Sequence, residues 1–120
     1  MEILIVDDEP QVAEVLARSL AREGHTAKVA HSGEEALKLL LTIEPDALFL
    51  DISMPGMNGL DVLHQVKRMR PSLPVVVITG NATADEVEEV KRLGAVDVIA
   101  KPAPLIHYQQ ALRRLDLPRV

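Results

Sequence analysis

The sequence contains no cysteine, which excludes a disulfide framework and any thiolate metal site. It also lacks an excess of positive charge, because the formal net charge is -5, and this argues against a surface that binds nucleic-acid phosphates. Its apolar runs are a few residues long, far below the roughly 20 residues that cross a bilayer. Met1 and Glu2 lead into the first apolar run without a signal segment. We therefore expect a cytoplasmic protein with no direct contact to nucleic acid or membrane.

Length and composition predict a single domain. The chain has 120 residues, of which 48% are hydrophobic, enough to bury one shared core but too few residues for a second domain. No repeat, linker or low-complexity stretch interrupts it. The predicted domain covers residues 1–120.

Short apolar runs predict five strands. Most are apolar on both faces, which is typical of parallel strands covered by helices on each side. The run over 25–30 has mixed polarity and indicates a strand near a sheet edge, whereas the β-branched run over 75–78 favours a central position. The predicted strands cover 3–6, 25–30, 47–50, 75–78 and 96–100.

Helical periodicity fills the segments between these strands. Gly24 and Gly94 mark the ends of the first and fourth helices, over about 10–23 and before 94. Ser32 with Glu35, and Thr83 with Glu86, are capping-box signatures. The third helix follows the turn at 58–59, and the fifth ends near 115. Alternating strands and helices with right-handed crossovers predict an α/β fold, a three-layer (βα)5 doubly wound parallel sheet.

Polar residues follow four of the five predicted strands. Asp7 and Asp8 follow the first strand, Asp51 the third, Thr79 the fourth and Lys101 the fifth. The carboxyl ends of parallel strands meet at one edge of the sheet, where the reactive sites of open α/β folds lie. We therefore expect three carboxylates, a hydroxyl and an amine in one place.

The three carboxylates indicate a metal site. Asp7, Asp8 and Asp51 would raise one another's pKa values unless a cation lay among them. Oxygen ligands without nearby His or Cys favour a hard ion, and an open site completed by water suits Mg²⁺ better than Ca²⁺. A carboxylate beside Mg²⁺ can attack phosphorus and hold an acyl phosphate, while Lys101 and Thr79 would neutralise the phosphoryl oxygens.

In the order and spacing of these motifs, the chain resembles the receiver domain of two-component response regulators along nearly its whole length. The matching residues are Asp7–Asp8, Asp51 with Met54–Pro55 and Gly59, Thr79, and Lys101–Pro102. The resemblance implies a flavodoxin-like strand order of 2-1-3-4-5. It also implies that the bond between Lys101 and Pro102 is cis.

The resemblance assigns a role to each site residue. Asp51 would be the phosphoacceptor, with Thr79 and Lys101 holding the phosphoryl oxygens. The implied Mg²⁺ ligands are Asp51, Asp8 directly, Asp7 through a water, and Ser53 through its backbone carbonyl. On this reading the protein is not an enzyme, but a signalling domain that assists only its own phosphorylation and dephosphorylation.

The resemblance also implies partners. The phosphoryl donor would be a phosphohistidine on a sensor histidine kinase or a histidine phosphotransfer protein. The response would reach an output domain or a downstream protein, and the resemblance allows a homodimer to form on phosphorylation.

Two positions depart from the family's pattern. Val98 stands three residues before Lys101, where receivers usually have an aromatic ring that moves with the threonine, and Ala103 stands where Phe is frequent. Valine is small and stiff at χ1, so it cannot report phosphorylation by a ring movement. We therefore expect the response to reach the fourth and fifth helices through shifts of the loop over 79–83.

Several alternatives remain open at this stage. Asp7 and Asp8 would also suit the cap of the first helix, and the acidic run over 85–89 is interpreted as a solvated helix face. Two other functions compete with the signalling one: a degenerate receiver that only binds proteins, and a phosphatase resembling the haloacid dehalogenases. The phosphatase class has an Asp-x-Asp motif after its first strand, whereas this chain has Asp7-Asp8-Glu9.

Overall fold

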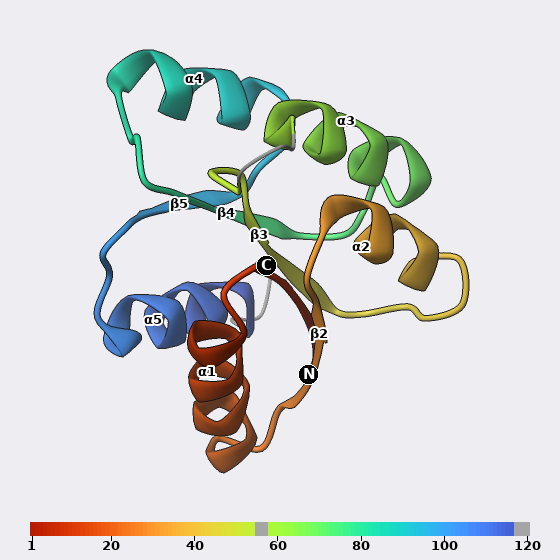
Figure 1. The fold of residues 1–120 in the computed structure, drawn as a ribbon, viewed down its shortest axis with the longest axis vertical. Helices are drawn as coiled ribbons and strands as arrows, with labels where there is room; N and C mark the ends of the chain where they lie inside the picture. Colours follow the sequence, from red (N-terminus) through yellow and green to blue (C-terminus); the bar gives the residue numbers. More distant parts are fainter. Residues whose placement is uncertain (55–57, 117–120) are drawn as a thin grey trace.

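The computed structural model describes residues 1–54 and 58–116, so Pro55 of the predicted motif and residues 117–120 of the predicted domain lie outside the described residues. In the described part, five parallel strands form one sheet in the order β2-β1-β3-β4-β5 (Figure 1). The strands are β1 (Glu2–Val6), β2 (Thr26–Ala30), β3 (Ala47–Asp51), β4 (Val75–Thr79) and β5 (Asp97–Ala100). The predicted fold class and strand order are confirmed.

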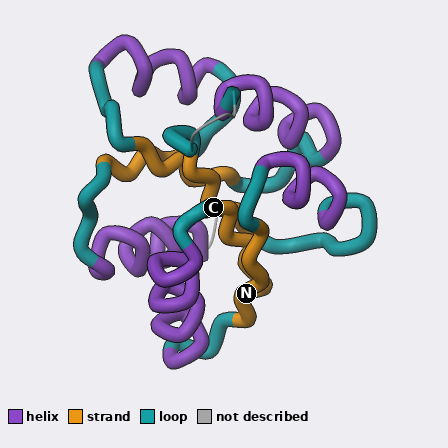
Figure 2. Tube along the Cα trace, viewed as in Figure 1, coloured by secondary structure: helices purple, strands orange, loops and turns teal. Residues whose placement is uncertain are grey.

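Helices cover both faces of this sheet, which gives three layers (Figures 1 and 2). Helices α1 and α5 lie on one face, where the buried residues of α1 pack with Phe49 of β3 and Tyr108 of α5. Helices α2, α3 and α4 cover the other face, over a core that includes Leu48 and Leu50 of β3. The helices are α1 (Pro10–Arg22), α2 (Gly33–Leu39), α3 (Gly59–Met69), α4 (Ala84–Arg92) and α5 (Leu105–Asp116).

The sequence signals place most of these elements to within one or two residues. The strand of mixed polarity, β2, lies at a sheet edge, and β3 is the middle strand. Every residue of β3 and β4 is buried, because each strand has a neighbour on both sides and helices on both faces. Gly24 and Gly94 follow α1 and α4 with φ angles of 89° and 109°, a conformation that glycine adopts without the strain a Cβ would add.

Parallel pairing in this register brings the carboxyl ends of β1, β3, β4 and β5 to one edge of the sheet. None of the helices in the described part is both long enough and apolar enough to span a membrane.

Candidate functional site

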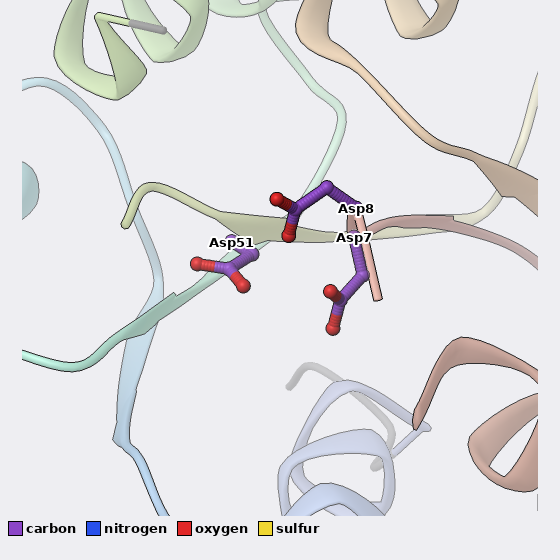
Figure 3. A group of neighbouring side chains, drawn as sticks. All are labelled: Asp7, Asp8 and Asp51. Carbon is purple, nitrogen blue, oxygen red and sulfur yellow. The ribbon is translucent and has the colours of Figure 1, made fainter. Parts of the chain in front are cut away.

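Three carboxylates meet at this edge of the sheet. Asp7 and Asp8 directly follow β1, and Asp51 is the last residue of β3 (Figure 3). One oxygen from each carboxylate lies within 4.8 Å of the others. The convergence of the three acids predicted from the sequence is therefore observed.

The buried polar residues of the described chain all belong to this edge. Asp51 and Thr79 are each 1% exposed and Asp7 is 3% exposed. Polar groups are normally buried only where they have partners, because desolvation disfavours their charged or unpaired state. A protein that needed only a stable core would place apolar side chains here, so this burial marks a functional site.

Asp51 is held in a fixed orientation by neighbours on both of its oxygens. Its Oδ1 accepts hydrogen bonds from the backbone N–H of Ser53 and from the Ser53 hydroxyl, both at 2.8 Å. Its Oδ2 accepts a hydrogen bond from the Lys101 ammonium. The side chain is thus oriented by groups from two loops, which pre-organises it for reaction.

The Lys101 ammonium bridges the carboxylates. Besides Asp51, its Nζ lies 3.8 Å from Asp7 and 3.7 Å from Glu9. Partial burial lowers the pKa of Lys101, but the hydrogen bond to Asp51 and the charges of the three acids outweigh burial and raise it. Lys101 therefore stays a cation beside Asp51, as predicted, and the bond that joins it to Pro102 is cis.

The Asp7 carboxylate is partly desolvated. Burial raises its pKa, and the charges of Asp51 and Glu9 act in the same direction, against the backbone N–H of Glu9 at 2.9 Å and the charge of Lys101. The N-cap of α1 is Glu9, which makes no side-chain capping bond. Neither Asp7 nor Asp8 is therefore the N-cap residue, although the Asp7 carboxylate accepts a hydrogen bond from the N–H of Glu9.

The Thr79 hydroxyl contacts α4 in this structure, and its role on a phosphoryl oxygen stays a prediction. The hydroxyl donates a hydrogen bond to a carboxylate oxygen of Glu86, on the first turn of α4, and accepts one from the backbone N–H of Asn81 at 3.1 Å. Thr83 caps α4 as predicted, accepting from the Glu86 N–H at 3.2 Å. The Glu86 side chain, however, neither completes a capping box nor belongs to a solvated face, because Thr79 binds it.

Gly59, at the start of α3, lies in close backbone contact with Ile52, which follows β3. A Cβ added to Gly59 would lie 2.6 Å from the Cα and 2.8 Å from the carbonyl oxygen of Ile52, distances at which atoms overlap. Met54, which also follows β3, is buried in the core beneath α3. Gly59 is therefore required where the start of α3 approaches the segment that follows Asp51.

Two aromatic rings pair in the core on one face of the sheet, although not at the position usual for receivers. Val98 is only partly buried against the core. Phe49 of β3 and Tyr108 of α5 pack edge to face, with ring centroids 5.7 Å apart. Burial raises the pKa of Tyr108, Lys101 lowers it, and Asp7 and Asp51 raise it. The Tyr108 ring thus belongs to the apolar core with Phe49 and does not stand at the position of the movable ring.

Sequence reasoning missed two acids of this region. Glu9 follows the Asp pair in the sequence, yet its approach to Lys101 depends on the position of β5. Glu86 matched a capping signature, which predicted a local partner and not Thr79, seven positions earlier in the chain. For both acids, the contact depends on how separate elements pack in three dimensions, which the local sequence does not indicate.

The donor set fits a hard divalent cation. The clustered ligands are carboxylates, without nitrogen or sulfur in the group, and such oxygen-only sites suit Mg²⁺ or Ca²⁺. Two of the three acids are buried, so a cation would relieve their repulsion and desolvation. Asp8 is exposed and leaves one side open to water.

Comparison with known proteins agrees with this arrangement. A family model described as the response regulator receiver domain matches residues 3–113. The response regulator MprA of Mycobacterium ulcerans is 38% identical over 115 residues, which are 96% of this chain and 50% of that protein. The chain thus spans about half the length of the curated relatives it matches.

Solved structures give the same result. A CheY-like receiver domain protein from Methanospirillum hungatei has a TM-score of 0.89 and 26% identity, covering 96% of this chain and 93% of that one. A response regulator from Burkholderia pseudomallei, solved with a phosphorylated aspartic acid, a calcium ion and citrate, has a TM-score of 0.84 and 28% identity, covering 99% of this chain and 76% of that one.

Proposed function

Because this chain belongs to the response regulator receiver domain family, we propose that Asp51 accepts a phosphoryl group from a phosphohistidine. The observation that carries the proposal is the Asp51 carboxylate, 1% exposed, held between the Lys101 ammonium and the acids that follow β1. The phosphorylated aspartic acid of the Burkholderia pseudomallei relative supports it.

The proposed transfer forms one bond to phosphorus and breaks another. A carboxylate oxygen of Asp51 forms a bond to the phosphorus atom as the bond between that phosphorus and the histidine nitrogen breaks. The imidazole keeps the electron pair of the broken bond, and Asp51 becomes an acyl phosphate. Catalysis of this step is mainly positioning and charge neutralisation, which Lys101 supplies as a compact cation.

Asp7, Asp8, Asp51 and the backbone carbonyl of Ser53 are the proposed ligands of Mg²⁺. When bound, this ion neutralises negative charge on the phosphoryl oxygens. The chain's own residues do the rest. Ser53 orients Asp51 through two hydrogen bonds to Oδ1, and Lys101 donates to the other oxygen, Oδ2, where its charge would lie beside an incoming phosphoryl group.

We propose a signalling role and not turnover of an external substrate. The domain would assist only its own phosphorylation and dephosphorylation, in the cytoplasm. The donor would be a sensor histidine kinase or a histidine phosphotransfer protein, and the receiver would act on an output domain or a downstream protein, with a homodimer as one form of the phosphorylated state.

Phosphorylation of the purified chain by acetyl phosphate tests this function. With Mg²⁺, intact-mass spectrometry should find one added phosphoryl group, which does not form when Mg²⁺ is chelated beforehand or in Asp51→Asn. Asp85→Asn is the matched control, because it makes the same change at an exposed aspartate of α4. Modification that survives in Asp51→Asn would contradict the assignment.

The same assay separates the alternatives. A chain that is never modified would support a degenerate receiver that only binds proteins, whereas release of phosphate from a phosphomonoester would support a phosphatase. The family match already disfavours the phosphatase, because a receiver domain model covers nearly the whole chain.

A further inference from the structure

The Thr79 hydroxyl and the Glu86 carboxylate form a link between the site and α4. Thr79 is the last residue of β4 and is buried, and Glu86 lies on the first turn of α4. The loop between them is tied by two further bonds, from the Asn81 N–H to the Thr79 hydroxyl at 3.1 Å and from the Thr83 N–H to the Asn81 carbonyl at 2.9 Å.

A threonine hydroxyl has one proton to donate. In this structure Thr79 donates it to Glu86, so the same proton is not available to any group on Asp51. If Thr79 holds a phosphoryl oxygen, as the proposed function requires, it must first release Glu86. The two hydrogen bonds are mutually exclusive.

We propose that Glu86 is a positioning residue that competes with the phosphoryl group for the Thr79 proton and so holds the unphosphorylated arrangement of the β4–α4 loop. This inference rests on the proposed function and adds to it the residue that sets the resting state. Carboxylates are strong acceptors of hydrogen bonds from hydroxyl groups, so the competition is substantial.

The negative charge of the phosphoryl group favours transfer of the Thr79 hydrogen bond from Glu86 to that group. A phosphoryl group on Asp51 carries roughly -1.5 to -2 charge at pH 7 where the carboxylate carried -1, at the strand end next to Thr79. The phosphoryl oxygens attract the Thr79 proton, and their negative charge disfavours the Glu86 carboxylate nearby. The released Glu86 keeps its place in the helix, because the bond from its N–H to the Thr83 hydroxyl does not involve its side chain.

Weak anchoring of α4 lets this exchange reach the helix. Among the described residues, α4 buries only Val90, whereas α3 buries Gly59, Val62, Leu63 and Val66. Val98 supplies no movable ring on β5. The Thr79–Glu86 hydrogen bond is therefore a direct connection by which the state of Asp51 could set the position of the first turn of α4.

Beryllium fluoride, which mimics a phosphoryl group on a carboxylate, provides the test. It is titrated with Mg²⁺ into the chain while amide signals of Gly80 and Asn81 are followed by NMR. Glu86→Ala should tighten binding by about tenfold, the factor expected when a competing hydrogen bond to a charged group is removed. Glu86→Gln should tighten it less, because the amide oxygen still accepts the Thr79 proton.

Two comparisons separate this role from a structural one. Glu88→Gln makes the same charge change at an exposed site on α4 and should leave the affinity unchanged. In a Thr79→Val background, Glu86→Ala should lose its effect, since no proton is left to compete for. Without beryllium fluoride, the Asn81 signal of Glu86→Ala should already move toward its bound position, and that of Glu88→Gln should not.

The outcomes are distinct. If the wild-type chain binds beryllium fluoride but Glu86→Ala and Glu86→Gln bind it no more tightly, the inference is wrong and the proposed function stands. If Glu86→Ala tightens beryllium fluoride binding equally in the Thr79→Val background, Glu86 acts through its charge or through the stability of α4. The proposed competition for the Thr79 proton is then also overturned. If the wild-type chain neither binds the mimic nor is phosphorylated, the proposed function fails and the inference fails with it.

Discussion

The site has two halves that differ in how firmly the fold holds them. The acid half consists of Asp7, Asp8 and Asp51 at the ends of β1 and β3, and the response half consists of Thr79, Glu86 and Val98 on β4, α4 and β5. From Ile3 to Val6 and throughout β3 the strands of the acid half are buried. In the response half, β4 is also buried throughout, but β5 buries only Ile99 of its four residues, and α4 buries only Val90.

This difference matches the task of each half. Transfer to Asp51 needs atoms fixed to a fraction of an ångström, which β3 and the buried part of β1 provide. Transmission of the signal needs an element that can move at little free-energy cost, and sparse apolar burial gives a segment low local stability. The two halves meet at Lys101, whose ammonium contacts Asp51 and Asp7 from the end of β5.

The rigidity of the acid half is most severely tested at Gly59. Gly59→Ala places a Cβ against the backbone of Ile52, and overpacking of this kind should lower the free energy of unfolding by about 3 kcal/mol. Urea unfolding measures it. Gly80→Ala is the control, since its Cβ would meet only the Ser53 side chain at 3.7 Å. Equal free energies of unfolding for the two variants would show that the contact between Gly59 and Ile52 leaves room for a Cβ.

A matched pair of valines sharpens the comparison. Val90→Ala in α4 and Val66→Ala in α3 each remove two buried methyl groups, worth about 2 kcal/mol. For Val66→Ala we expect the loss in global unfolding free energy. For Val90→Ala we expect mainly faster amide exchange within α4, with β1 and β3 unchanged. The same exchange pattern in both variants would remove the distinction between a rigid and a movable half.

Removal of one acid tests the metal-binding part of the acid half. Asp8→Asn should weaken Mg²⁺ binding by roughly tenfold, or about 1.4 kcal/mol, because it removes a carboxylate charge from the cluster. Isothermal titration calorimetry measures the change. Glu9→Gln is the control: its exposed carboxylate contacts Lys101 but lies outside the cluster, so its effect should be smaller. A larger effect of Glu9→Gln would contradict the ligand assignment.

The two halves also differ in how far the sequence predicts them. The acid half follows from the parallel sheet, because apolar runs that end in Asp7, Asp8 and Asp51 place their carboxyl ends at one edge of it. Lys101 follows from the same rule. These residues were predictable because hydrophobic patterning indicates parallel strands between helices, whereas the order of the strands was implied by the resemblance to receivers.

The response half depends on side-chain partners, which patterning does not determine. Glu35 and Glu86 have the same position in a capping signature, three residues after Ser32 and Thr83. Glu35 accepts from the backbone N–H of His31, next to the cap, whereas Glu86 binds the Thr79 hydroxyl. A buried hydroxyl at the end of β4 competes successfully for Glu86, and no local pattern reveals it.

The smallest expected effect concerns the loop between β4 and α4, within the response half. With Mg²⁺ and beryllium fluoride, amide exchange over 79–83 and the first turn of α4 should change by less than about tenfold, or about 1.4 kcal/mol, while β1 and β3 stay protected. Loss of the Glu86 bond frees the loop, but the bond from the Asn81 N–H to the Thr79 hydroxyl can persist when that hydroxyl turns toward Asp51, because the hydroxyl oxygen still accepts. Partial loosening is therefore expected, not unfolding. An unchanged loop beside a phosphorylated Asp51 would mean that the signal leaves the site by another route, and the response half would have to be assigned to different residues.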